Sequence, residues 1–287
     1  MMQPPRGMHF DFLHPEGEPA LQPPDSMSWR IFKNPVSVFI GGVAAVILEL
    51  AEPSVRSGVW DHSSFRRDAV MRLRRTGACA MMTVYGPAGA AQAMIERVVR
   101  IHEQIRGTTP SGLPYEANDP RLLDWVQATA SYGFIEAYSR FVHRLTAQER
   151  AQAISEGAVA ARLYGAVGAP RSQAEWEALL AKTGPTLESS PIVFEFLDIM
   201  HQAPLVPRPL RAVQRLMVRA AIDIVPHNIR LMLGLEQAGL SPVQRRLVKL
   251  AGQISDRVPI RTAPPAQASI RVARDPTFLY RPAKARH

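Results

Sequence analysis

The sequence contains a single cysteine, Cys79, in 287 residues. A lone cysteine cannot form an intramolecular disulfide, and it excludes a cysteine-based zinc site and the Cys-x-x-Cys-His attachment of covalent haem. Such cysteine usage is typical of a reducing compartment. The chain also begins without a charged region that leads into an apolar run, so we expect no secretory signal and a cytoplasmic location.

Strand patterns and familiar enzyme motifs are scarce as well. Extended polar–apolar alternation with hairpin turns does not occur, which argues against a β-rich fold. The sequence lacks the G-x-G-x-x-G, Walker A, G-x-S-x-G and H-E-x-x-H patterns, so nothing indicates a nucleotide-binding loop, a serine hydrolase or a zinc protease. Asp198 and His201 form the only acidic-x-x-His pair on an expected helix, which excludes a carboxylate-bridged di-iron bundle.

The stretch that comes nearest to a membrane span is residues 36–51. It is shorter than the roughly 20 apolar residues that a span needs, and it contains Glu49. We therefore predict a buried core helix. Trp29, Arg30 and Lys33 precede it, which leaves a peripheral membrane contact open.

Positive charge is abundant, with a formal net charge of +9. This balance favours anionic partners such as nucleic acid, anionic lipid or a cofactor that bears carboxylates. The densest cationic groups lie in residues 66–75 and 261–286, and no zinc-finger, RRM or basic-zipper pattern accompanies them. We therefore expect no binding to nucleic acid.

Helical signals dominate most of the chain and predict an all-α fold with one domain. We expect an irregular proline-rich arm over residues 1–28, a helical domain over 29–258 and an irregular basic tail over 259–287. One helix should run from Pro87 to about Arg106, and another from Pro120 to near Arg144. Further helix starts are predicted by capping residues at Thr146, Ser172 and Ser241.

The segment from His62 to Thr76 reads as helical and places Asp68, Arg72 and Thr76 on one face. A guanidinium and a hydroxyl on one face could orient oxygen or anchor a carboxylate. The alternative is structural: Asp68 pairs with Arg72, and Thr76 bonds back to a carbonyl.

His102 lies on an apolar stripe with Ile95, Val98, Val99 and Ile105. Such a histidine is either a hydrogen-bonded core residue or a metal ligand, since an axial haem ligand needs a neutral imidazole on an apolar wall.

Glu49 and Glu52 stand three residues apart in the apolar helix. Either the helix end is exposed there, or a buried carboxylate with a raised pKa acts as a base.

Short motifs follow one another in a fixed order along the chain: Gly41-Gly42, Gly58-Val59, His62-Ser63, Phe65, Asp68, Arg72-Leu73, Arg75-Thr76, Tyr85-Gly86, Arg100, His102, Gly107, Gly112, Tyr115, Ala117-Asn118-Asp119-Pro120, Leu122-Leu123, Trp125-Val126 and Ala128-Thr129. With this pattern the chain, from about residue 30 to 240, resembles the catalytic-domain family shared by latex-clearing rubber oxygenases and the membrane-bound oxygenase of mycophenolic acid biosynthesis.

This resemblance implies a globin-like helical domain with extra helices around a non-covalent haem b. It implies O2-dependent cleavage or oxidation of a hydrophobic, isoprenoid-like substrate. His102 would be the proximal iron ligand. The resemblance places Arg72, Thr76, Arg75 and His62 around the cofactor.

The sequence departs from the family pattern at several of these positions. Arg75 stands where rubber oxygenases can carry a distal lysine ligand, and a guanidinium has no lone pair to offer iron. Gln127 replaces a frequent histidine. Glu49 and Glu52 replace a usual Gln and His, so Glu52 is a candidate compensating base.

Two other function classes remain alternatives. The chain could be a helical protein that binds haem or lipid without turnover. It could also be a metal-dependent enzyme that uses His62, Glu49, Glu52 and His102.

Overall fold

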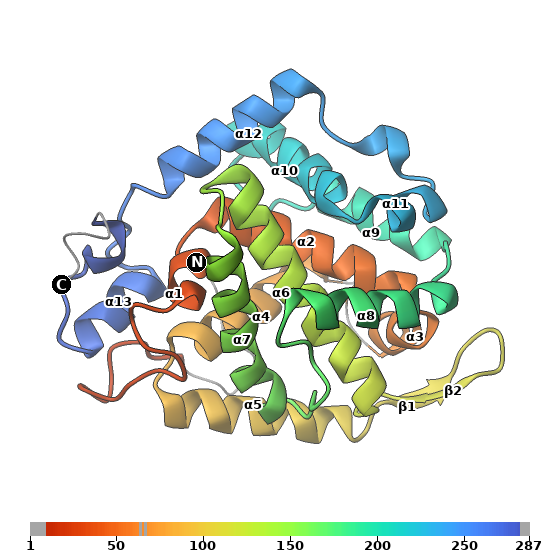
Figure 1. Ribbon diagram of the computed structural model, residues 1–287, viewed down its shortest axis with the longest axis horizontal. Helices are drawn as coiled ribbons and strands as arrows, with labels where there is room; N and C mark the ends of the chain where they lie inside the picture. Colours follow the sequence, from red (N-terminus) through yellow and green to blue (C-terminus); the bar gives the residue numbers. More distant parts are fainter. Residues whose placement is uncertain (1–9, 63–64, 66–67, 282–287) are drawn as a thin grey trace.

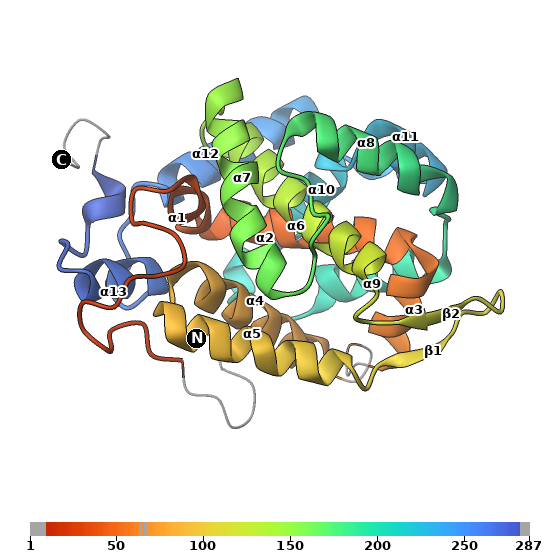
Figure 2. The ribbon, with the colours of Figure 1, turned by 60° about the horizontal axis from the view of Figure 1, so that its bottom comes forward.

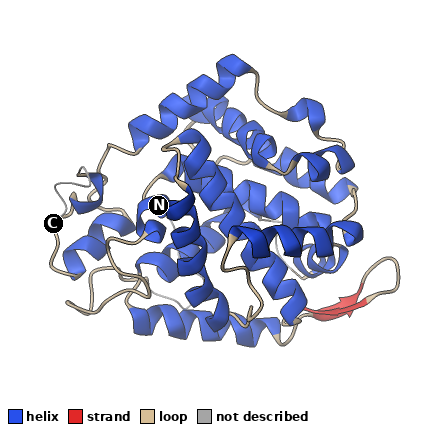
Figure 3. Cartoon of the chain, in the orientation of Figure 1, coloured by secondary structure: helices blue, strands red, loops and turns tan. Residues whose placement is uncertain are grey.

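The computed structural model describes residues 10–62, 65 and 68–281, and this part of the chain is almost entirely helical (Figure 3). It contains thirteen α-helices and a single two-stranded sheet, which confirms the all-α prediction. The globin-like arrangement stays a prediction. The α-helices are α1 Met27–Phe32, α2 Pro35–Ala51, α3 Pro53–Asp61, α4 Ala69–Tyr85, α5 Ala88–His102, α6 Pro120–Phe141, α7 Ala147–Leu163, α8 Gln173–Thr183, α9 Pro191–Gln202, α10 Arg211–Ile224, α11 His227–Met232, α12 Pro242–Ser255 and α13 Pro264–Arg271.

Short elements join these helices. The strands β1 Arg106–Thr108 and β2 Pro114–Glu116 pair antiparallel, with Gly107 opposite Tyr115. The 3-10 turns are η1 Gly184–Thr186, η2 Arg208–Leu210, η3 Glu236–Ala238 and η4 Phe278–Tyr280.

Capping residues set the predicted helix starts. Thr146 and Ser241 each complete a capping box, which confirms the starts of α7 and α12. Ser172 accepts the backbone N–H of Glu175 and so begins α8, but the Glu175 carboxylate accepts the N–H of Arg171 rather than closing the box.

Several predicted boundaries are wrong. Helix α5 ends at His102 rather than Arg106, because the following residues leave the helix to form the β1–β2 hairpin. The helix predicted from His62 to Thr76 starts later than expected, because His62 follows α3 as its C-cap and Asp68 is the N-cap of α4. Residues 63–64 and 66–67 lie outside the described residues.

The expected irregular tail is wrong in part, because it carries α13 and η4. Arg271 at the end of α13 is buried and donates hydrogen bonds to the carbonyls of Glu18 and Phe12, at 2.8 Å each. The tail therefore packs against the proline-rich arm and is hydrogen-bonded to it. The two ends of the described chain lie on one side of the molecule (Figure 1).

The centre of the fold is the crossing of α2 and α6. Trp125 on α6 donates its indole N–H to the carbonyl of Leu48 on α2, at 3.2 Å. Gly41 and Gly133 lie at the crossing: a Cβ on Gly41 would stand 2.8 Å from the Gly133 carbonyl oxygen, and a Cβ on Gly133 would stand 2.4 Å from the Gly41 oxygen. Neither position has room for a larger residue.

Helix α2 is a core helix, as predicted. Its largest side chains, such as Ile40, Ile47 and Leu50, are fully buried in the main hydrophobic cluster. No single helix of the described residues has the length and apolar composition to cross a membrane, although α2 and α3 together meet that test across a 110° bend.

The side chains of Trp29, Arg30 and Lys33, which precede α2, are engaged in tertiary contacts. Trp29 is fully buried against Tyr85. Arg30 pairs with Glu149 at 2.6 Å, and Lys33 pairs with Asp256 at 3.0 Å. Tertiary packing therefore engages all three side chains, and a peripheral membrane contact of the protein stays a prediction.

The Gly41–Gly42 pair allows a matched test of the crossing. Gly41→Ala should lower the free energy of unfolding by about 1–3 kcal/mol, because the new methyl meets the backbone of α6. Gly42→Ala meets only a ring atom of Phe134 at 3.9 Å and should gain up to about 1 kcal/mol from helix propensity. Chemical denaturation of both variants measures this, and equal effects would contradict the close crossing.

Candidate functional site

The structure brings Arg72 and His102 together. Helices α4 and α5 are joined by a short turn at Gly86 and Pro87, so they run in opposite directions, and the start of α4 meets the end of α5 (Figure 2). Arg72 lies in the first turn of α4, and His102 is the last residue of α5. Both side chains are half-buried.

The charge of Arg72 acts on His102. Burial lowers the pKa of His102, and the positive charge of Arg72 lowers that pKa further. The imidazole is therefore neutral at neutral pH, with a lone pair on one ring nitrogen.

Glu49 is the third member of this site. It lies on a stripe of α2 formed by Gly42, Val46 and Glu49, which are half-buried while their neighbours between residues 41 and 51 are buried. Burial raises the pKa of Glu49 from 4.5 to about 7, and Arg72 offsets part of this rise. In return, Glu49 offsets part of the lowering of the Arg72 pKa by burial. The guanidinium stays charged.

Within the described part of the chain, the side-chain nitrogen atoms of Arg72 and His102 have no protein partner. Among the described residues, neither the guanidinium of Arg72 nor the ring of His102 forms a hydrogen bond to a protein atom, and Arg72 and Glu49 form no direct ion pair. Arg75 lies one turn from Arg72, and its buried Nε also lacks a partner in this part of the chain. Unpartnered polar atoms in a half-buried place are typical of a binding site.

The end of α5 is held in place by the following loop. The side-chain amide of Asn118 donates to the carbonyl of Val99 at 3.1 Å, and the N–H of Ala117 donates to the carbonyl of Ile105 at 2.9 Å. In β1, Gly107 allows the hydroxyl of Tyr115 to approach, since a Cβ there would lie 2.7 Å from it. These contacts hold the last turn of α5, which carries His102.

Thr76 is on the same helix as Arg72, but its side chain is exposed. Its hydroxyl donates to the carbonyl of Arg72 at 3.0 Å, which is the structural alternative raised by the sequence. Asp68 accepts the N–H of Met71 at 3.1 Å and caps α4, so the expected pairing with Arg72 does not form. A contact of Thr76 with a cofactor stays a prediction.

Glu52 is placed as a helix cap. Its carboxylate accepts the N–H of Val55 at 2.8 Å and pairs with Arg121 at 3.1 Å, so both oxygens are used. The sequence indicates this role, because a carboxylate directly before Pro53 is typical of an N-cap followed by proline in the first turn of a helix. Glu49, rather than Glu52, interacts electrostatically with Arg72, and a role of Glu52 as a base stays a prediction.

His62 is exposed at the end of α3, and its Nε2 lies 3.1 Å from the hydroxyl of Tyr115. The described residues contain no cluster of three or more His, Cys, Asp or Glu that could hold a metal ion. The proposed four-residue metal site therefore does not assemble, because Glu52 and His62 are engaged elsewhere.

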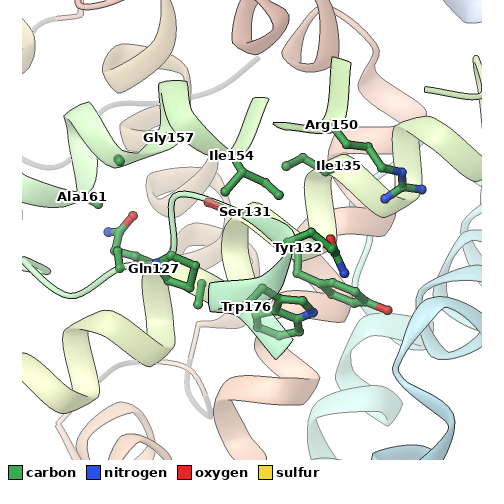
Figure 4. A pocket seen from close by; sticks show the side chains of 14 residues that line it. Gln127, Ser131, Tyr132, Ile135, Arg150, Ile154, Gly157, Ala161 and Trp176 are labelled. Carbon is green, nitrogen blue, oxygen red and sulfur yellow. The ribbon is translucent and has the colours of Figure 1, made fainter. Parts of the chain in front are cut away.

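A separate cavity lies between α6, α7 and α8 (Figure 4). It is lined by Gln127, Ser131, Tyr132 and Trp176 together with small residues of α7. Its volume of about 30 Å³ holds no more than about two water molecules. Neither Arg72 nor His102 lines it, so Gln127 does not join the site through this cavity.

The raised pKa of Glu49 predicts a pH dependence of stability. The folded protein binds a proton on Glu49 up to about pH 7, whereas the unfolded chain releases it near 4.5, so wild-type stability falls as pH rises between these values. Glu49→Gln removes this loss: between pH 5 and 8 the wild type should lose about 2 kcal/mol relative to the variant.

Denaturant unfolding at several pH values measures this difference. Glu96→Gln, which removes an exposed carboxylate on α5, is the matched control and should keep the wild-type slope. Parallel pH profiles for wild type and Glu49→Gln would contradict the buried placement of Glu49.

Comparison with known proteins identifies the family. Residues 29–255 match the family described as ER-bound oxygenase mpaB/B'/Rubber oxygenase, catalytic domain. No curated protein and no solved structure matches the chain. The match covers more than half of the sequence and includes Glu49, Arg72 and His102. The chain therefore belongs to the mpaB/rubber oxygenase catalytic-domain family.

Proposed function

We propose that this protein is a b-type haem oxygenase that acts on a hydrophobic, isoprenoid-like alkene. The observation that carries the proposal is the pair of Arg72 and His102: a neutral imidazole and a charged guanidinium, both without a protein partner among the described residues. They lie in one half-buried site of a chain that belongs to an oxygenase family.

The donor set fits a haem. An axial iron ligand must be a neutral imidazole with an apolar surrounding, and His102 has a lowered pKa and follows the apolar residues Ile95, Val98 and Val99 on α5. One histidine is enough, because the porphyrin supplies the other four ligands to the iron. The absence of a multidentate cluster among the described residues is therefore compatible with this cofactor.

Two arginines could hold the carboxylates of the porphyrin. Arg72 has a free guanidinium, and Arg75 has a buried Nε without a partner in the described chain. A charge-assisted hydrogen bond from either group to a propionate is stronger than a neutral one. Arg75 cannot ligate the iron, since a guanidinium has no lone pair.

When bound, the haem iron supplies the activation of O2. The chain supplies the surroundings. Arg72 can donate a hydrogen bond to a polarised oxygen atom, and Thr76 could contribute its hydroxyl if it leaves the Arg72 carbonyl. Glu49 holds a proton on its carboxyl for about half of the molecules at pH 7, so it can give or take a proton next to Arg72.

Apolar side chains accompany these groups. Val46, Leu73, Ile105 and Val126 are half-buried and pack against the main hydrophobic cluster from α2, α4, the α5–β1 turn and α6. Val46 lies one turn before Glu49, and Leu73 follows Arg72. This composition suits an alkene rather than a charged substrate.

The proposal predicts haem binding that depends on His102. Titration of the purified protein with hemin should give a shifted Soret band, and His102→Ala should remove the shift. Arg72→Gln should weaken hemin binding roughly tenfold to a hundredfold, the range expected when a charged hydrogen bond is lost. His201→Ala is the matched control, because His201 is another half-buried histidine with a lowered pKa, on α9.

Equal spectra for wild type and His102→Ala would overturn the proposed ligand. Hemin binding without O2-dependent consumption of any polyprenyl substrate would instead indicate a haem-binding protein without turnover.

A further inference from the structure

Helix α12 carries a row of apolar side chains on its outer face. Val243, Leu247, Leu250 and Ile254 are 65%, 52%, 54% and 55% exposed. Successive residues of an α-helix are rotated by about 100°, which places these four within a narrow stripe on one side of the helix. We call them the α12 stripe. Soluble surfaces rarely keep such a row without a use.

The α12 stripe points directly away from the core. The buried residues of α12 are Val248 and Gly252, which lie on the opposite side of the helix. Gly252 packs so closely on α6 that a Cβ there would stand 2.4 Å from the carbonyl oxygen of Phe141. Figure 1 shows α12 along the upper edge of the molecule, outside α10 and α2.

The inner face of α12 is firmly anchored, so the stripe belongs to a fixed surface. The side-chain amide of Asn34 donates to the carbonyl of Gly252 at 2.9 Å, and Lys33 pairs with Asp256 at 3.0 Å. At the other end, Arg245 pairs with Asp223 of α10 at 3.0 Å. The helix cannot turn its apolar side inward without breaking these contacts.

Cations flank the α12 stripe. Arg246 borders the stripe, Lys249 lies further round the same side of the helix, and Arg257 follows the helix end; all three are exposed. The apolar row also continues past the helix end, where Val258 and Ile260 are 51% and 49% exposed. An apolar stripe with basic residues at its edge is the pattern of a helix that lies in the interface of an anionic bilayer.

We propose that the α12 stripe docks this protein onto an anionic phospholipid surface, with the helix parallel to the membrane plane. The surrounding charge favours lipid over a second copy of the chain. A second copy placed stripe against stripe would add its own cations to this basic surface, whereas lipid phosphates complement the cations. This surface differs from the site of Arg72 and His102, so its test does not depend on haem or on turnover.

Flotation with vesicles tests the proposal. The protein should float with vesicles of phosphatidylcholine and phosphatidylglycerol, and less with phosphatidylcholine alone. Replacing Leu247, Leu250 and Ile254 together by Gln should weaken this partition roughly a hundredfold, because three half-exposed aliphatic side chains no longer enter the interface. Arg246→Gln with Lys249→Gln should weaken it roughly thirtyfold and reduce its salt dependence.

The matched control replaces the same number of exposed apolar side chains elsewhere. Val159, Leu163 and Val167, on α7 and in the loop that follows, are also exposed, and their triple Gln variant should bind like the wild type. Circular dichroism confirms that each variant is folded. Wild-type protein that ignores anionic vesicles, or a stripe variant that binds them unchanged, would overturn the proposal. So would a dimer in light scattering that only the stripe variant abolishes.

Discussion

The close crossing of α2 and α6 is the constraint on which the rest of the structure depends. Gly41 and Gly133 allow the backbones of α2 and α6 to approach closely. Helix α2 thereby lies inside the main hydrophobic cluster, among the other helices. Burial of nearly every face of α2 leaves one stripe, from Gly42 to Glu49, that is only half-covered. The carboxylate of the candidate site is on that stripe, so its raised pKa is a consequence of the way the core is built.

The site combines three ionisable groups whose states are set by burial and by one another. Burial favours the neutral forms of Glu49 and His102, and the charge of Arg72 opposes the first effect and reinforces the second. A fixed cation is thereby placed beside a neutral imidazole and a carboxyl that exchanges its proton near neutral pH. This arrangement offers a ligand, a hydrogen-bond donor and a proton at one place, from His102, Arg72 and Glu49.

Local signals predicted much of the fold. Thr146 and Ser241 begin helices because their side chains satisfy backbone N–H groups next to them in the sequence. The end of α5 and the helix in the tail were not predicted, since the first depends on the β1–β2 hairpin and the second on contacts of Arg271 with the distant residues Phe12 and Glu18. Such contacts leave no local pattern in the sequence.

The candidate site was predicted in the same uneven way. Arg72 and His102 were identified as a pair, and the antiparallel α4–α5 hairpin brings them together. Glu52 was chosen over Glu49 because spacing alone cannot distinguish two carboxylates three residues apart. The distinction depends on where α2 ends, and the proline after Glu52 marks that end.

The most direct test of the account is the structure of the protein crystallised with hemin. We expect electron density for iron bonded to Nε2 of His102, with the porphyrin carboxylates at the guanidinium groups of Arg72 and Arg75. Iron bonded to another residue, such as His62 or His201, or hemin on the outer surface, would contradict it.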